Sequence, residues 1–196
     1  LGDVNKEQWG ISILRSGRGD ARRAVWIDHD AGGRHSHRDG LNIGLFAKGR
    51  DLLPDFGYPP VGYGGWSAPK AVWYTKSAAH NTVVVDSQDH QVARGRTELW
   101  GSGEALHIAR VAGPELIRGE RFARTVALVD LSAEDCYLVD IADVCGGGRE
   151  HAKFVSSGLG AMTWGGLAPA PAATPWEVGE ELRMDRRDPA PAPGWW

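Results

Sequence analysis

The sequence predicts an all-β fold, a multi-stranded antiparallel β-sandwich with little helix. Short runs of alternating apolar and polar residues recur along the chain, separated by turns that contain Gly or Pro. No apolar pattern of period 3.6 persists over three helical turns. The 196 residues, 42% of them hydrophobic, are enough for one domain with a sizeable core. Many short strands at regular spacing are typical of a sandwich or a barrel.

The expected strands follow one another closely. The first covers residues 9–14 and forms a hairpin with the second, at 24–28. Later strands are expected at 41–47, 51–55 and 82–85, two within "GRTELWGSGEALHIARVAG", one each in "RFARTVALVD" and "CYLVDIADV", and one after "GGGREH". In the segment around His107, Leu106 and Ile108 share one face, so His107 is expected on the surface of the sheet.

A long irregular loop is predicted at residues 56–69, "FGYPPVGYGGWSAP", because Gly, Pro and aromatic residues dominate it. Such a loop in a compact domain is usually functional. Its Tyr58, Tyr63 and Trp66 could stack on sugar rings, or they could pin the loop to its own domain. The sequence leaves both readings open.

Two parts of the chain differ in composition. Residues 1–164 are predicted to form the sandwich, and residues 165–196 a Pro/Ala-rich, loosely ordered tail. Six of the eleven prolines fall in this tail, and such a composition favours extended chain that buries little surface.

Charge and composition limit the partners. The net charge of −3 and the pI of about 6.2 give no global attraction to nucleic acid or to an anionic membrane. No run of about 18 apolar residues predicts a membrane span, and no basic, apolar leader stands at Leu1, so a signal peptide is expected to be absent or to have been lost with a missing N-terminal part. Cys136 and Cys145 bracket one expected strand and should not pair with each other. Six arginines before or inside the motif described next could form a basic patch or be ordinary surface residues: Arg15, Arg18, Arg22, Arg23, Arg34 and Arg38.

The stretch most suggestive of chemistry runs from Arg34 to Gly57, with a partner at 78–86. In extended chain, the side chains of His35, His37 and Asp39 would lie on one face, followed on that face by Leu41, Ile43 and Leu45. One imidazole from this pair, a carboxylate at Asp55 and the imidazole of His80 would give a divalent cation such as zinc three ligands and a free fourth position. The same residues could equally be solvated polar groups at strand ends.

The strings "HSHRDGLNIGLFAKGRDLLPDFG" and "AAHNTVVVD" resemble the signature of the heparinase II/III-like polysaccharide lyases, which include alginate and oligoalginate lyases. The upstream "WGISILRSG" and "AVWIDHDAGG" resemble the strands that lead into it, so the resemblance covers about Trp9 to Gln91. In that family the motif belongs to a β-sandwich that follows an α/α toroid, with the active site in the cleft between them. The resemblance therefore implies a toroid domain N-terminal to this chain.

The resemblance also implies roles. His35 resembles the residue that faces the uronate carboxylate at the catalytic centre, and His37, Asp55 and His80 resemble the ligands of a structural zinc. Tyr63 is our candidate for a tyrosine that lines the cleft, and its competitors are Tyr58 and Tyr74.

The function expected from the resemblance is β-elimination in an anionic, uronate-containing polysaccharide, by a periplasmic or secreted protein. The family takes its acid/base Tyr, and usually an Asn and a further His, from the toroid. None of these 196 residues reads as a toroid, so the activity of this part alone is in question. One alternative is a non-catalytic carbohydrate-binding or structural sandwich, which the nine tryptophans favour. Another is a cupin metalloenzyme, but cupins place a Glu after the second His with three or four residues between, where this chain has Leu41 and Asn42.

Overall fold

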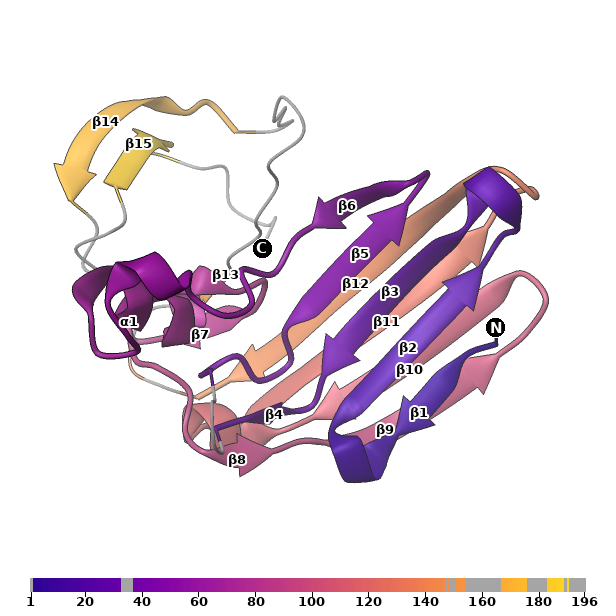
Figure 1. Ribbon diagram of the computed structural model, residues 1–196, viewed down its shortest axis with the longest axis horizontal. Coiled ribbons are helices and arrows are strands. Elements are labelled where there is room, and N and C mark those ends of the chain that lie inside the picture. Colours follow the sequence, from indigo (N-terminus) through magenta and orange to yellow (C-terminus); the bar gives the residue numbers. More distant parts are fainter. Residues whose placement is uncertain are drawn as a thin grey trace. The chain divides into compact units, whose positions relative to one another are not determined.

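The computed structural model describes residues 2–32, 37–146, 148, 151–153, 167–175, 183–188 and 190. Two antiparallel sheets overlie one another in the first part of the chain (Figure 1). One has the order β1-β2-β3-β5-β6, with strands Val4–Lys6, Ile11–Ser16, Arg23–Asp28, Ile43–Ala47 and Arg50–Leu53. The other has the order β12-β11-β10-β9, with strands Cys136–Cys145, Arg121–Asp130, Leu106–Ala112 and Arg96–Ser102. The predicted antiparallel β-sandwich is confirmed.

The core lies between the two sheets because alternate side chains of each strand point inward. In β3, Val25 and Ile27 are fully buried, and in β11 Phe122, Val126 and Leu128 face them across the interior. In β10 the inward face carries His107 with its neighbours at 109 and 111. The prediction that His107 lies on the sheet surface is therefore wrong: its ring is buried, and Nδ1 lies 2.7 Å from Asp3 Oδ2.

Shorter elements gather at one end of the sandwich, where α1 and β7 lie (Figure 1). Strand β7 (Val83–Val85) pairs with β13 (His151–Lys153), and β4 (Asp30–Ala31) pairs with β8 (Ala93–Arg94). Among the described residues, the α-helix is α1 (Pro69–Thr75). The 3₁₀ turns are η1 (Glu7–Trp9), η2 (Gly19–Ala21), η3 (Val61–Tyr63), η4 (Ser77–Ala79) and η5 (Pro114–Ile117).

The chain divides into two compact units, Leu1–Gly158 and Leu159–Trp196. Within the second unit, β14 (Ala170–Pro175) and β15 (Arg183–Arg187) form an antiparallel pair. The composition did not predict this pair, because Pro-rich chain usually lacks ladder donors; here a register shift between Pro171 and Thr174 interrupts the ladder. The boundary proposed at residue 164 stays a prediction.

Three details differ from the sequence predictions. Strand β5 begins at Ile43 rather than at 41, because Leu41 has a φ of 54° and the amide of Asn42 bonds back to Asp39 in a turn. The period-two row from His35 to Leu45 is therefore broken. Arg23 is not a surface arginine: it is buried and forms an ion pair of 2.9 Å with Asp130.

Two other expectations concern the cysteines and membrane-spanning helices. Both cysteines are free and stand at the two ends of β12, as predicted. No helix among the described residues is long and apolar enough to cross a membrane.

Candidate metal centre

Three chain segments meet at the end of the sandwich that carries α1. His37 lies in the loop that leads to β5, Asp55 follows β6, and His80 lies between η4 and β7. The β5-β6 hairpin returns the chain along β5, and this brings Asp55 beside the residues that precede β5. One potential ligand atom from each of the three side chains lies within 4.8 Å of the others. The structure therefore brings together the three ligands predicted from the sequence.

The Asp55 carboxylate is held from both sides. Oδ1 accepts a hydrogen bond of 2.7 Å from the backbone N–H of Gly57, and Oδ2 accepts one of 2.8 Å from Asn42 Nδ2. Nδ1 of His80 lies 2.8 Å from the same Oδ2, and Nε2 of His80 lies 3.0 Å from the carbonyl oxygen of Tyr74. Because Nε2 can donate to this carbonyl, Nδ1 is the nitrogen that can turn a lone pair toward a cation.

His37 supplies the observation that favours a cation most directly. Its Nε2 atom is buried and has no hydrogen-bond partner among the described residues. An unpaired buried nitrogen costs free energy, so such groups in proteins generally have a partner. Its ring lies 5.0 Å from the ring of His80. Two imidazole nitrogens and one carboxylate oxygen are a donor set that zinc accepts, so these residues fit the ion.

The electrostatics of His37 and Asp55 suit a cation, whereas the raised pKa of His80 favours a proton that a cation would have to displace. Burial lowers the pKa of His37, and the neighbouring charge of His80 lowers it further, so His37 is in the neutral form that a metal requires. Burial alone would raise the pKa of Asp55, but the hydrogen bond and charge of His80, with the bonds from Gly57 and Asn42, lower it to about 2. For His80, burial opposes the charged form, but Asp55 and Asp39 outweigh it and raise the pKa.

Two asparagines support the centre, and the sequence reasoning missed both. Asn42 donates to Asp55 through Nδ2, and its Oδ1 accepts a 2.9 Å bond from the backbone N–H of Asn81. Asn81 is buried, and its Nδ2 donates to the carbonyls of Ile43 and Pro54, at 3.0 and 3.2 Å. The signal was present in the sequence, because both are amides placed inside apolar runs, where a buried polar group needs a specific partner.

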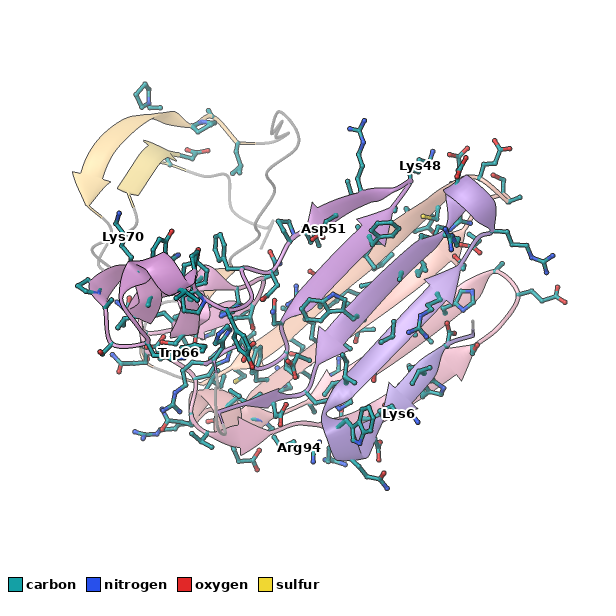
Figure 2. The ribbon with its side chains drawn as sticks, in the orientation of Figure 1. Lys6, Lys48, Asp51, Trp66, Lys70 and Arg94 are labelled. Carbon is teal, nitrogen blue, oxygen red and sulfur yellow. The ribbon has the colours of Figure 1, made fainter. Side chains whose placement is uncertain are left out.

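Aromatic residues of the 56–69 loop and α1 lie beside the centre. Tyr58 and Trp66 each lie 6.3 Å from the ring of His37, and 5.2 Å from each other. Tyr63 lies against Tyr74 at 5.9 Å, and Nζ of Lys70 is 5.8 Å from the Tyr63 ring. Trp66 and Lys70 are labelled in Figure 2, at the end of the sandwich that carries α1.

Among the three competing tyrosines, Tyr58 is therefore the one in ring contact with a predicted ligand. Tyr74 holds His80 through its carbonyl, and Tyr63 packs on Tyr74. The role predicted for Tyr63 stays a prediction. His35, the other predicted catalytic residue, lies outside the described residues.

An antiparallel sandwich with a cluster of two His and one Asp at one end defines a β-sandwich domain with a candidate metal centre. Comparison with known proteins names its family. Residues 4–131 match the model of the family described as heparinase II/III-like, C-terminal, and the chain belongs to this family.

The most similar relatives in the curated and structural comparisons include lyases. The chain is 29% identical over 161 residues to the exo-oligoalginate lyase of Saccharophagus degradans, covering 74% of this chain and 22% of that protein. It is 29% identical over 82 residues to the heparin-sulfate lyase of Pedobacter heparinus, covering 41% of this chain and 12% of that protein. The chain thus spans about a fifth or less of the length of these relatives.

Solved structures agree on the fold. A heparinase III gene product aligns with a TM-score of 0.71 at 18% identity, over 84% of this chain and 25% of its own. A mutant of the heparan sulfate lyase of Pedobacter heparinus aligns with a TM-score of 0.60 at 23% identity, over 72% of this chain and 22% of its own.

Proposed function

We propose that this chain is the β-sandwich part of a polysaccharide lyase that cleaves an anionic, uronate-containing polysaccharide by β-elimination. The observation that carries the proposal is the convergence of His37, Asp55 and His80 in a chain that belongs to the heparinase II/III-like family. The relatives named as oligoalginate and heparin-sulfate lyases support the substrate class. An α/α toroid N-terminal to this chain, and a periplasmic or secreted location, remain parts of the same proposal.

The chemistry of β-elimination defines what the complete site must provide. A base removes the proton from C5 of the uronate, and the C5–H electron pair forms the C4–C5 double bond. The C4–O glycosidic bond breaks, and its electron pair leaves with the glycosidic oxygen, which then takes up a proton. The C5 proton is only weakly acidic because the adjacent carboxylate is already charged, so a donor must offset the charge that develops there.

We assign that donor role to His35 and the task of holding the surrounding segments to His37, Asp55 and His80. A zinc ion bound by these three side chains would join the loop before β5 to the segments that follow β6 and η4. His37 lies two residues after His35 in the chain, so fixing His37 also restricts where His35 can go. The base and the proton donor for the leaving oxygen would come from the toroid.

The exposed aromatic residues near the centre offer a surface on which sugar rings can stack. Phe56, Tyr58 and Trp66 have 50%, 66% and 40% of their surface exposed, and they lie within one loop. A patch of exposed large aromatic side chains beside the candidate centre is the kind of surface that marks a ligand-binding site. These residues would position a uronate oligomer beside His37.

The test of the proposal uses this chain as part of its complete gene product. Uronate polysaccharides, alginate and heparan sulfate among them, are incubated with it, and the ultraviolet absorbance of the new C4–C5 double bond is followed. We expect absorbance to rise with one of them, and His35→Ala to remove the rise while circular dichroism stays unchanged. No rise with any uronate polysaccharide would contradict the proposal, and retained activity in His35→Ala would reject the role of His35.

A non-catalytic carbohydrate-binding domain is the second candidate, favoured by the same exposed aromatic surface. Affinity electrophoresis of the gene product in gels containing each polysaccharide separates the two. Retardation without any rise in absorbance favours the binding domain, and retardation together with a rise favours the lyase.

A further inference from the structure

Arg124 is the largest fully buried side chain of the described residues, with none of its surface exposed. It lies on β11 and points into the core between the sheets, on the same face as Phe122 and Val126. Its guanidinium binds Asp140 of β12 in a bidentate manner, with Nε to Oδ1 at 2.8 Å and Nη2 to Oδ2 at 2.7 Å. The Asp140 side chain is 16% exposed, so the pair is largely shielded from water.

The same guanidinium also binds two backbone carbonyls in the segments that hold the side chains of the metal centre. Nη1 donates to the carbonyl oxygen of Leu41 at 2.7 Å, and it donates to the carbonyl oxygen of Asn81 as well. Leu41 directly precedes Asn42, whose side chain holds Asp55, and Asn81 directly follows His80. One nitrogen atom therefore joins the segment of Asn42, whose side chain holds the Asp55 carboxylate, to the segment that carries His80.

This connection acts at a strained position of the backbone. Leu41 is held at a φ of 54°, a left-handed conformation that side chains other than Gly rarely adopt. Such a conformation costs about 1–3 kcal/mol and persists only where the surroundings enforce it. The hydrogen bond that Arg124 donates to the Leu41 carbonyl supplies one such constraint, and the hydrogen bond that the Asn81 backbone N–H donates to Asn42 Oδ1 supplies another.

A contribution to overall stability does not explain why Arg124 and Asp140 form a buried ion pair. Replacing a buried ion pair by apolar residues of similar size is often neutral or stabilising, because desolvation cancels much of the attraction between the charges. What apolar residues cannot do is donate two hydrogen bonds to carbonyls of separate segments. The particular contribution of Arg124 is therefore to the relative position of these two segments.

We propose that Arg124, oriented by Asp140, is a positioning residue for the metal centre. It sets the separation between the segment that carries Asn42, and through it Asp55, and the segment that carries His80. This inference rests on the proposed zinc site and adds to it a residue on the opposite sheet, so that β11 and β12 take part in forming the centre.

The chain contains a matched control. Arg23 is also buried and pairs with an aspartate, Asp130 at the last position of β11. It too donates to backbone carbonyls, those of Ala21, Ser132 and Ala133. These carbonyls belong to turns that carry none of the three candidate ligands. Substitutions in this pair therefore change a buried Arg–Asp bridge of the same kind without touching the frame of the centre.

The experiment compares Arg124→Met/Asp140→Leu with Arg23→Met/Asp130→Leu and the unchanged chain. Zinc affinity is measured by competition with a chromophoric chelator, and the unfolding of the metal-free proteins by circular dichroism. We expect the first double variant to bind zinc about 10-fold to 100-fold more weakly, the effect typical of removing groups that orient ligands. The Arg23 variant should keep the affinity of the unchanged chain, even where both variants unfold at similar temperatures.

A second substitution covers the case in which the double variant does not fold. Arg124→Lys keeps the buried charge but loses the planar fork, so it cannot bind Asp140 and both carbonyls together. Faster hydrogen exchange of the Asn81 amide, with weaker zinc binding, is expected in this folded variant.

The outcomes separate the two proposals. If the unchanged chain binds no zinc, the zinc site and the role of Arg124 both fall. If the unchanged chain and the Arg124 variants bind zinc equally well, the zinc site stands and only the role of Arg124 is overturned. Equal weakening in the Arg23 and Arg124 variants would also overturn it, because a general loss of rigidity would then suffice.

Discussion

The prediction that follows most directly from the site is that zinc stabilises the chain through His37. Substituting His37 by Gln removes the buried Nε2 that has no hydrogen-bond partner among the described residues, and keeps a polar side chain in its place. Because Nε2 makes no hydrogen bond among the described residues, the substitution should change metal-free stability less than it changes the response to zinc. It should abolish the extra stability that zinc provides.

The size of the effect follows from linkage. A ligand that binds only the folded state at a free concentration one hundred times its dissociation constant stabilises it by about 2.7 kcal/mol. For a chain of this size each kcal/mol raises the melting temperature by about 2–4 °C. Zinc should therefore raise the melting temperature by about 5–11 °C at that concentration, and a chelator should reverse the change.

The assay is thermal unfolding followed by circular dichroism, with and without zinc, for the unchanged chain and His37→Gln. His29→Gln is the control, because His29 is also a buried histidine with an unpartnered Nδ1 but lies outside the centre. We expect zinc to stabilise the control as it does the unchanged chain. A zinc-induced shift of full size in His37→Gln would refute the reasoning.

Three further predictions concern other parts of the structure. Trp66→Ala should weaken binding of uronate oligosaccharides several-fold, measured by affinity electrophoresis, without changing zinc affinity. Burial raises the pKa of Asp28 from 3.8 to about 8. Between these pH values the folded chain keeps a proton that the unfolded chain loses, so the free energy of unfolding falls as pH rises. In urea titrations, the free energy of unfolding of Asp28→Asn should depend less on pH over this range. A Cβ at Gly44 would lie 2.2 Å from Trp26 Nε1, so Gly44→Ala should cost about 1–3 kcal/mol in urea unfolding. Gly62→Ala, with nothing within 4 Å, should not.

Much of the fold was accessible from local pattern. Strands such as 24–28 showed the period-two alternation that a half-buried sheet imposes, and the structure has β3 at Arg23–Asp28. The helix α1 was missed because its seven residues give too short a pattern for period 3.6, in a segment rich in Gly and aromatic residues. The burial of His107 was not predicted, because its neighbours Leu106 and Ile108 are more apolar and were expected to face the core. In the structure the ring of His107 is buried beside Asp3, which lies more than a hundred residues away in the chain.

Of the candidate centre, only the three ligands could be predicted from the sequence. His37, Asp55 and His80 stand out as polar residues beside apolar strands, and the family resemblance selected them from other His and Asp residues. The residues that hold them could not be assigned in the same way. Arg124 lies 43 positions after Asn81, and only the stacking of the two sheets brings them together. Contacts between residues far apart in the chain depend on the tertiary structure. In the sequence they are marked only by a polar residue inside an apolar run.

X-ray absorption at the zinc edge, on the chain loaded with one equivalent of zinc, tests the central claim most directly. The three side chains predict two imidazole nitrogens at about 2.0–2.1 Å and a carboxylate oxygen at about 2.0–2.2 Å, with one remaining position. The imidazole signal should fall by half in His80→Ala. A spectrum with sulfur ligands, or one without imidazole scattering, would contradict the metal centre on which the account depends.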